Sequence, residues 1–158
     1  MTNQIQTDDF TNTLYGLLDE TFDNVQGYYL DKGTSMFETL ATVSAAEASV
    51  PVGGKCATLA AQVKHTAFYL DVLVEALRTQ KFERQDWDKI WRETGAVGPE
   101  EWDEIKASLR ESYNSVKAYI AETPNWAGDR QIGGIIATIV HTAYHLGEIR
   151  QALCTLKD

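Results

Sequence analysis

The sequence contains three histidines, and two of them are spaced so that both could bind the same metal ion. His141 and His145 are four positions apart in a stretch with helical periodicity, so their side chains project from one helix face about 6 Å apart. Two imidazoles at this spacing can bind one ion. The third, His65, belongs to another expected helix and could reach across to them. Three nitrogen ligands leave at least one coordination position open, as in catalytic metal sites.

Spacing alone also allows a structural interpretation, because a histidine is often a half-buried residue with a hydrogen-bond partner. Glu148 lies one turn beyond His145 on the same face, where it could orient a ligating imidazole or act as a general base near the metal. The alternative is a solvated glutamate or a partner for a nearby arginine. Residues 142–144 are Thr, Ala and Tyr, whereas the HExxH metalloproteases carry a glutamate between their histidines, so that class is disfavoured.

Other side chains near the histidines have weaker claims on a site. Tyr69 and Tyr144 could line the mouth of a pocket, although tyrosines at helical spacing are usually packing residues, and Arg150 should point away. Cys56 and Cys154 are each nine residues from the histidine on their own helix, which is about 180° around it and about 13 Å along its axis. Neither cysteine should be a ligand, and we expect two free thiols.

Four long amphipathic helices must position these residues. Apolar side chains recur with helical spacing, and capping residues, glycines and prolines bound each run. The expected long helices cover residues 8–29, 55–79, 99–123 and 130–156. A short helix is expected over 86–93, and the capping boxes Ser35/Glu38 and Ser44/Glu47 predict two helical turns in a connection of about 25 residues. With no persuasive strand pattern, the sequence predicts an all-α four-helix bundle forming a single domain over residues 1–158.

Composition narrows the classes of partner. The chain has 158 residues and a net charge of −9, with 14 basic residues scattered among 23 acidic ones, so nucleic acid is a poor candidate partner. The longest uncharged stretch, 131–147, is too short for a membrane span. Residues 1–10 lack the positive charge and the apolar core of a signal peptide. The cytoplasm is therefore the expected location.

The segment from His141 to Gln151, HTAYHLGEIRQ, closely resembles the last-helix signature of the DinB-like (DinB/YfiT-like) family. That signature is a histidine, three residues, a second histidine, then Gly-Glu or Gly-Gln, Ile and Arg-Gln. The likeness extends to Trp126-Ala-Gly, to His65 in the middle of the second long helix and to the four-helix layout, so it covers most of the chain. It implies that His65, His141 and His145 bind one divalent metal, most often zinc or nickel.

The resemblance also implies a class of activity. The family includes bacillithiol S-transferases, a mycothiol-dependent isomerase and proteins labelled as metal-dependent hydrolases. The leading hypothesis is a metal-dependent enzyme that activates a low-molecular-weight thiol for transfer to an electrophilic small molecule. A hydrolase using metal-activated water, and a non-enzymatic protein that binds a metal or small molecule, stay open. Related bundles pair as homodimers, and the same is expected here. The family's naming after DNA damage finds no support in this acidic composition.

Overall fold

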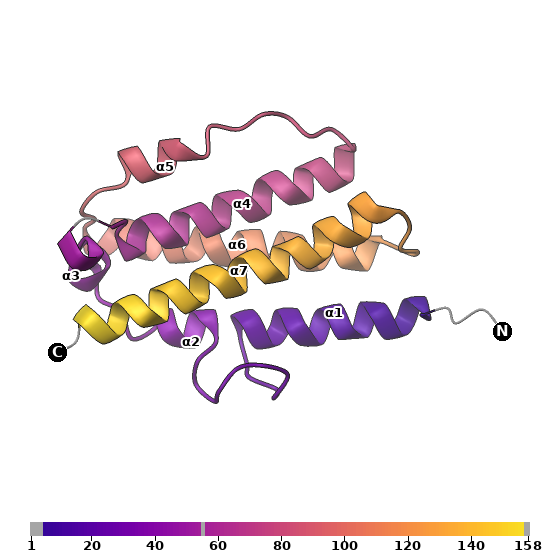
Figure 1. Cartoon of the computed structure of the whole chain (residues 1–158), viewed down its shortest axis with the longest axis horizontal. Helices are drawn as coiled ribbons and strands as arrows, with labels where there is room; N and C mark the ends of the chain where they lie inside the picture. Colours follow the sequence, from indigo (N-terminus) through magenta and orange to yellow (C-terminus); the bar gives the residue numbers. More distant parts are fainter. Residues whose placement is uncertain (1–4, 55, 157–158) are drawn as a thin grey trace.

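The structure is a computed structural model that describes residues 5–54 and 56–156, and these residues form an all-helical fold (Figure 1). Three long helices run side by side, and a shorter one packs along them. The α-helices are α1 (Thr7–Phe22), α2 (Met36–Leu40), α3 (Ala45–Ala48), α4 (Leu59–Thr79), α5 (Asp88–Glu93), α6 (Pro99–Glu122) and α7 (Asp129–Leu156), with a 3-10 turn η1 at Val52–Gly54. The prediction of an all-α bundle is confirmed.

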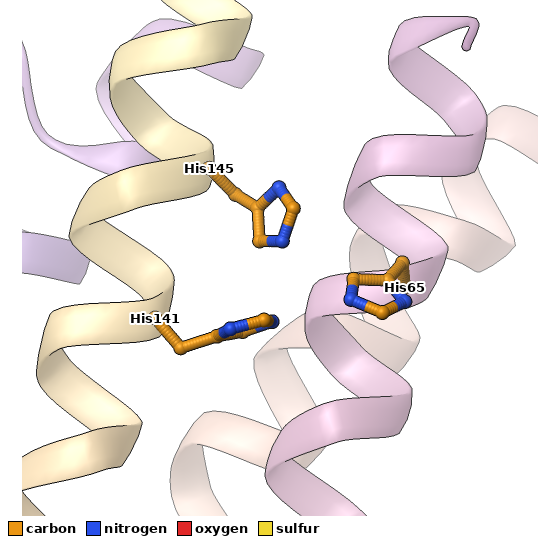
Figure 2. A group of neighbouring side chains, drawn as sticks. All are labelled: His65, His141 and His145. Carbon is orange, nitrogen blue, oxygen red and sulfur yellow. The ribbon is translucent and has the colours of Figure 1, made fainter. Parts of the chain in front are cut away.

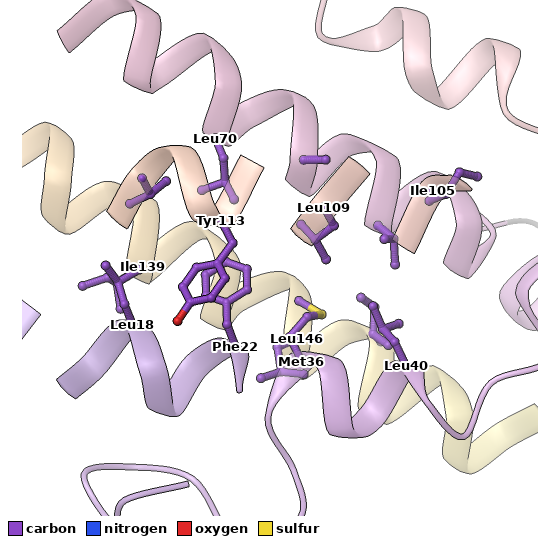
Figure 3. Close-up of a cluster of buried hydrophobic side chains, with 14 of the residues drawn as sticks. Leu18, Phe22, Met36, Leu40, Leu70, Ile105, Leu109, Tyr113, Ile139 and Leu146 are labelled. Carbon is purple, nitrogen blue, oxygen red and sulfur yellow. The ribbon is translucent and has the colours of Figure 1, made fainter. Parts of the chain in front are cut away.

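Helix α4 is the centre of the bundle, because it packs against both α6 and α7 while α1 packs against α7 and α6. The core fills the space between these helices (Figure 3). Phe22 at the end of α1 stacks on Tyr113 of α6, with ring centroids 4.4 Å apart. Trp102 is 2% exposed, and its indole N–H donates to the carbonyl of Val43 at 2.9 Å, which ties α6 to the long connection.

The first helix ends at Phe22, so the expectation that it continues to residue 29 is wrong. The cause is Glu20, which is fully buried and accepts hydrogen bonds from four backbone N–H groups of the following loop. The donors are Gln26 (2.9 Å), Tyr28 (2.8 Å), Tyr29 (2.5 Å) and Leu30 (2.7 Å). These N–H groups bind a carboxylate instead of the helix carbonyls, and the chain folds back on itself.

Both predicted capping boxes are present in the connection between α1 and α4. Ser35 caps α2 together with Glu38, and Ser44 caps α3 together with Glu47. The second long helix begins later than expected, at Leu59, because the Thr58 hydroxyl accepts from the N–H of Ala61 at 3.1 Å. The predicted start of this helix, residue 55, lies outside the described residues.

The connection from α4 to α6 crosses over the outer side of α4 and carries α5 (Figure 1). Helix α5 begins at Asp88, two residues later than expected, and contacts α4. Helix α6 opens with Pro99 at its first turn and ends at Glu122, before Pro124, as predicted. The last helix, Asp129–Leu156, also agrees with the expected bounds.

Small residues on the histidine face of α7 allow close helix packing. Thr138 and Thr142 are fully buried, and a Cβ at Gly134 would lie only 2.7 Å from Cδ2 of Leu77 on α4. The solvent side of α7 also carries apolar residues, since Ile136 is 41% and Val140 60% exposed. The small residues therefore bring α7 near enough to α4 for the histidines of both helices to meet.

Candidate metal centre

Helices α4 and α7 bring the three histidines together (Figure 2). His65, His141 and His145 each offer one nitrogen, and these nitrogens all lie within 4.8 Å of one another. The ring centroids are 5.2 Å apart for His65 and His141, 5.0 Å for His65 and His145, and 4.5 Å for His141 and His145. Among the residues that the structure describes, the group contains no fourth His, Cys, Asp or Glu. Such a cluster could hold one metal ion.

The tautomer of His145 follows from its partners. Its Nδ1 lies 2.9 Å from Oε2 of Glu148 and 2.6 Å from Oε1 of Gln62. A carboxylate can only accept, so Nδ1 carries the proton and donates. The other ring nitrogen, Nε2, is then the one with a free lone pair for the cluster. This is the carboxylate–histidine arrangement that fixes the orientation of metal ligands in proteins.

The other two histidines have buried nitrogens without partners. Neither Nδ1 of His65 nor Nε2 of His141 has a hydrogen bond with any described residue. Burial is the main cause that lowers the pKa of each imidazole to about 4, and the nearby His145 lowers it further. Both rings are therefore neutral near pH 7, the form that binds metal. An orphaned buried nitrogen is costly, and a cation bound among the three rings would use one nitrogen of each.

Aromatic rings enclose the cluster. Trp91 of α5 packs over His65 with centroids 4.4 Å apart, and Tyr69 of α4 stacks on His141 at 3.6 Å and an interplanar angle of 17°. Trp87 lies 6.1 Å from His65 on the same side. Tyr144 lies 5.1 Å from His145 but is 61% exposed. These contacts shield the imidazoles from water and hold their planes.

A groove of about 500 Å³ runs along α7 beside the partners of His145. Gln62, Glu148 and Gln151 provide much of its polar lining, and Tyr144 and Cys56 also border it. The groove therefore lies against Gln62 and Glu148, the two side chains that contact Nδ1 of His145.

The structure places most of the other residues singled out in the sequence near their expected positions. Tyr69 contacts the cluster directly, while Arg150 turns away and donates to the Thr39 hydroxyl at 3.4 Å. Cys56 and Cys154 are free, exposed thiols and lie outside the cluster.

Sequence reasoning missed Gln62 and the covering role of Trp87 and Trp91. The sequence could have predicted the position of Gln62, because this residue precedes His65 by three positions and so shares its face of the helix. The tryptophans are four apart on a short helix, which predicts one shared face, but nothing local says which part of the bundle that face covers.

Comparison with known proteins identifies the family. Residues 29–149, more than half of the chain, match the model of the DinB superfamily. The chain therefore belongs to the DinB superfamily, and the resemblance noted in its last helix is confirmed. The search of curated proteins and the search of solved structures each found no match.

Proposed function

We propose that the chain is a metal-dependent enzyme that binds one divalent ion, zinc or nickel, and transfers a low-molecular-weight thiol to an electrophilic small molecule. The supporting observation is the group of three buried or half-buried imidazoles, His65, His141 and His145, with nitrogens within 4.8 Å and no fourth ligand among the described residues. Three protein ligands leave a coordination position for an exogenous molecule. Membership of the DinB superfamily agrees with a metal site.

A divalent ion bound there would act as a Lewis acid that favours the thiolate form of a thiol near neutral pH. The protein's own contribution is to hold the site. Glu148 and Gln62 keep the ring of His145 oriented, and Trp91 and Tyr69 keep water from the other two imidazoles. In the reaction the thiol sulfur forms a bond to carbon, the leaving group departs with the bonding electron pair, and the thiol proton passes to solvent.

The position of Glu148 favours thiol transfer over hydrolysis. Its carboxylate accepts the Nδ1 proton of His145 at 2.9 Å, and it serves there as a positioning residue instead of a free general base. The cluster contains no other carboxylate among the described residues. A divalent metal deprotonates a coordinating thiol outright, whereas metal-bound water keeps a pKa of about 7 and gains more from a nearby base.

The first experiment measures metal content. Protein purified without a histidine tag is dialysed against zinc or nickel and analysed by mass spectrometry, alongside His145→Ala and the control Val140→Ala, an exposed residue of the same helix. We expect about one equivalent of metal in wild type and control and its loss in His145→Ala. Equal metal in all three proteins, or none in wild type, would overturn the metal site.

The second experiment measures turnover. Metal-loaded protein is mixed with a panel of cellular thiols and chromogenic electrophiles, and product is followed with and without thiol. Turnover that requires both thiol and metal supports the proposal. Turnover of esters or amides without thiol would support the hydrolase instead, and metal binding without any turnover would support a non-enzymatic metal-binding protein.

The proposal extends to the partners expected from the sequence: a small-molecule substrate, a second copy of the chain as a homodimer, and no nucleic acid or membrane. The net charge of −9 opposes attraction to phosphate backbones. No helix in the described part of the chain is both long enough and apolar enough to cross a bilayer. A cytoplasmic location is part of the same proposal.

A further inference from the structure

A hollow that adjoins the histidine cluster lies on the outer side of α4, where the connection to α5 passes over it. This groove, called here the α4 groove, has a volume of about 510 Å³. Its floor is the outer face of α4, including Val72, Leu73 and Ala76, and its roof is the segment from residue 81 to residue 87. The volume falls within the range of sites that hold drug-sized molecules.

The α4 groove shares an end wall with the metal centre. Tyr69 and Trp87 both line the groove, and their ring centroids are 5.8 Å apart. On their other side, Tyr69 stacks on His141 at 3.6 Å and Trp87 lies 6.1 Å from His65. A molecule held in the groove would therefore lie against the two rings that contact the imidazoles.

The charges on the groove are mostly negative. Asp71, Glu75 and Glu83 line it against one basic residue, Lys81. Glu75 and Glu83 form no ion pair within the described residues. Asp71 is exposed, as Glu75 and Glu83 are. A cation bound between Glu75 and Glu83 would gain their attraction without breaking an ion pair of either residue.

Aromatic rings supply the other half of the recognition. Phe82 lines the groove and is 53% exposed, and the guanidinium of Arg130 lies 5.8 Å from its ring centroid. Trp87 is also 37% exposed. Aromatic faces with nearby carboxylates are the usual means of binding organic ammonium groups.

We propose that the α4 groove is the subsite for the organic part of the substrate, and that it selects small molecules with an apolar or aromatic body and a cationic group. The proposal depends on the proposed function only for the reaction that follows binding. Binding itself needs neither metal nor thiol, so the two can fail separately.

The test uses 4-phenylbutylamine as the probe and 4-phenylbutyrate as its matched anion. Both are titrated into the full-length chain, with and without added zinc, and the four tryptophan indole N–H signals are followed by NMR. We expect the amine to shift the Trp87 signal, assigned with Trp87→Phe, and to leave that of the buried Trp102 unchanged. The anion should bind at least about fivefold more weakly. Equal binding of both probes, or no binding of either at millimolar concentration, would overturn the proposal.

Variants of the groove locate the probe. Glu75→Gln with Glu83→Gln should weaken amine binding roughly three- to tenfold and leave that of the anion no weaker, whereas Glu100→Gln, an exposed acid outside the groove, should change neither. Val72→Trp should block both probes by filling the floor. Because the two glutamates are exposed, their variants stay folded even if Val72→Trp does not. Unchanged amine affinity in the double glutamine variant would place the probe elsewhere.

Discussion

At the scale of single residues, the hydrogen bonds of His145 are the most specific feature of the centre. Its Nδ1 donates to Glu148 and lies within reach of Gln62, so Nε2 is presented to the other two imidazoles. Neither partner is a ligand in the cluster. The role of Glu148 is then to hold a ring and a tautomer, a role that an uncharged acceptor can also fill.

This role predicts different results for two substitutions. Glu148→Ala should lower zinc affinity about tenfold, because the imidazole loses its charged acceptor and keeps only the amide oxygen of Gln62. Glu148→Gln should keep most of the affinity, because the new amide oxygen still accepts from Nδ1. Competition with a chromogenic chelator measures both. If Glu148→Gln binds zinc as wild type does and yet loses all turnover, Glu148 is a base and the positioning role is wrong.

At the scale of elements, Glu20 decides where α1 ends, because its buried carboxylate accepts four backbone N–H groups of the loop after it. Glu20→Gln supplies only one acceptor oxygen, so about half of these donors lose a partner. Each buried unsatisfied donor costs roughly 1–3 kcal/mol, so two of them should lower the free energy of unfolding by roughly 2–6 kcal/mol, measured by urea denaturation. Glu38→Gln, in a short capping box, should cost less.

The same carboxylate predicts a dependence of stability on pH. Burial by itself would raise the pKa of Glu20, but the four backbone N–H groups more than compensate and lower it from 4.5 to about 2. Because the folded-state pKa is depressed, the stabilisation is complete above about pH 4.5 and is lost as the pH falls toward about 2. Wild type should therefore lose stability between these values more steeply than Glu20→Gln. Parallel curves for the two proteins would contradict the assignment.

Two adjacent glycines of α7 test how closely this helix approaches α4. A Cβ at Gly133 meets nothing within 4 Å, whereas one at Gly134 would lie 2.7 Å from Cδ2 of the buried Leu77. Gly133→Ala should stabilise the protein by about 1 kcal/mol through helix propensity. Gly134→Ala should lose that gain because the added methyl group overpacks against Leu77. Its free energy of unfolding should be at least about 1 kcal/mol below that of Gly133→Ala. Thermal denaturation compares the pair, and equal stabilities would mean that α7 can shift freely against α4.

At the scale of the whole molecule, the exposed side of α7 bears on the predicted homodimer. Ile136, Val140 and Tyr144 follow one another at single turns and are 41%, 60% and 61% exposed. We expect the chain of 17.6 kDa to sediment as a dimer at micromolar concentration and Val140→Lys to shift it toward the monomer, because a charge would be buried in the contact. Lys64→Glu, an exposed change on α4, is the control. A monomer in wild type would refute the dimer.

The sequence by itself determined the helical class, the family and the identity of the three histidines. These follow from patterns that are local: helical periodicity, capping boxes, the proline at the start of α6, and the four-residue spacing of His141 and His145. Local patterns predict helices well because the backbone hydrogen bonds of a helix join residues only four positions apart. The end of α1 was predicted wrongly because the side chain of Glu20 accepts the backbone N–H groups that would otherwise donate to helix carbonyls.

Tertiary structure alone decided which long-range partners surround the histidines. Gln62 reaches His145 across 83 positions, Trp91 of α5 covers His65, and the buried Thr138 and Gly134 allow α7 to approach α4. No periodic pattern in the sequence predicts these contacts, because each depends on how two separate helices are placed against each other. The α4 groove has the same origin, since it exists only because the chain returns over α4 before α5 begins.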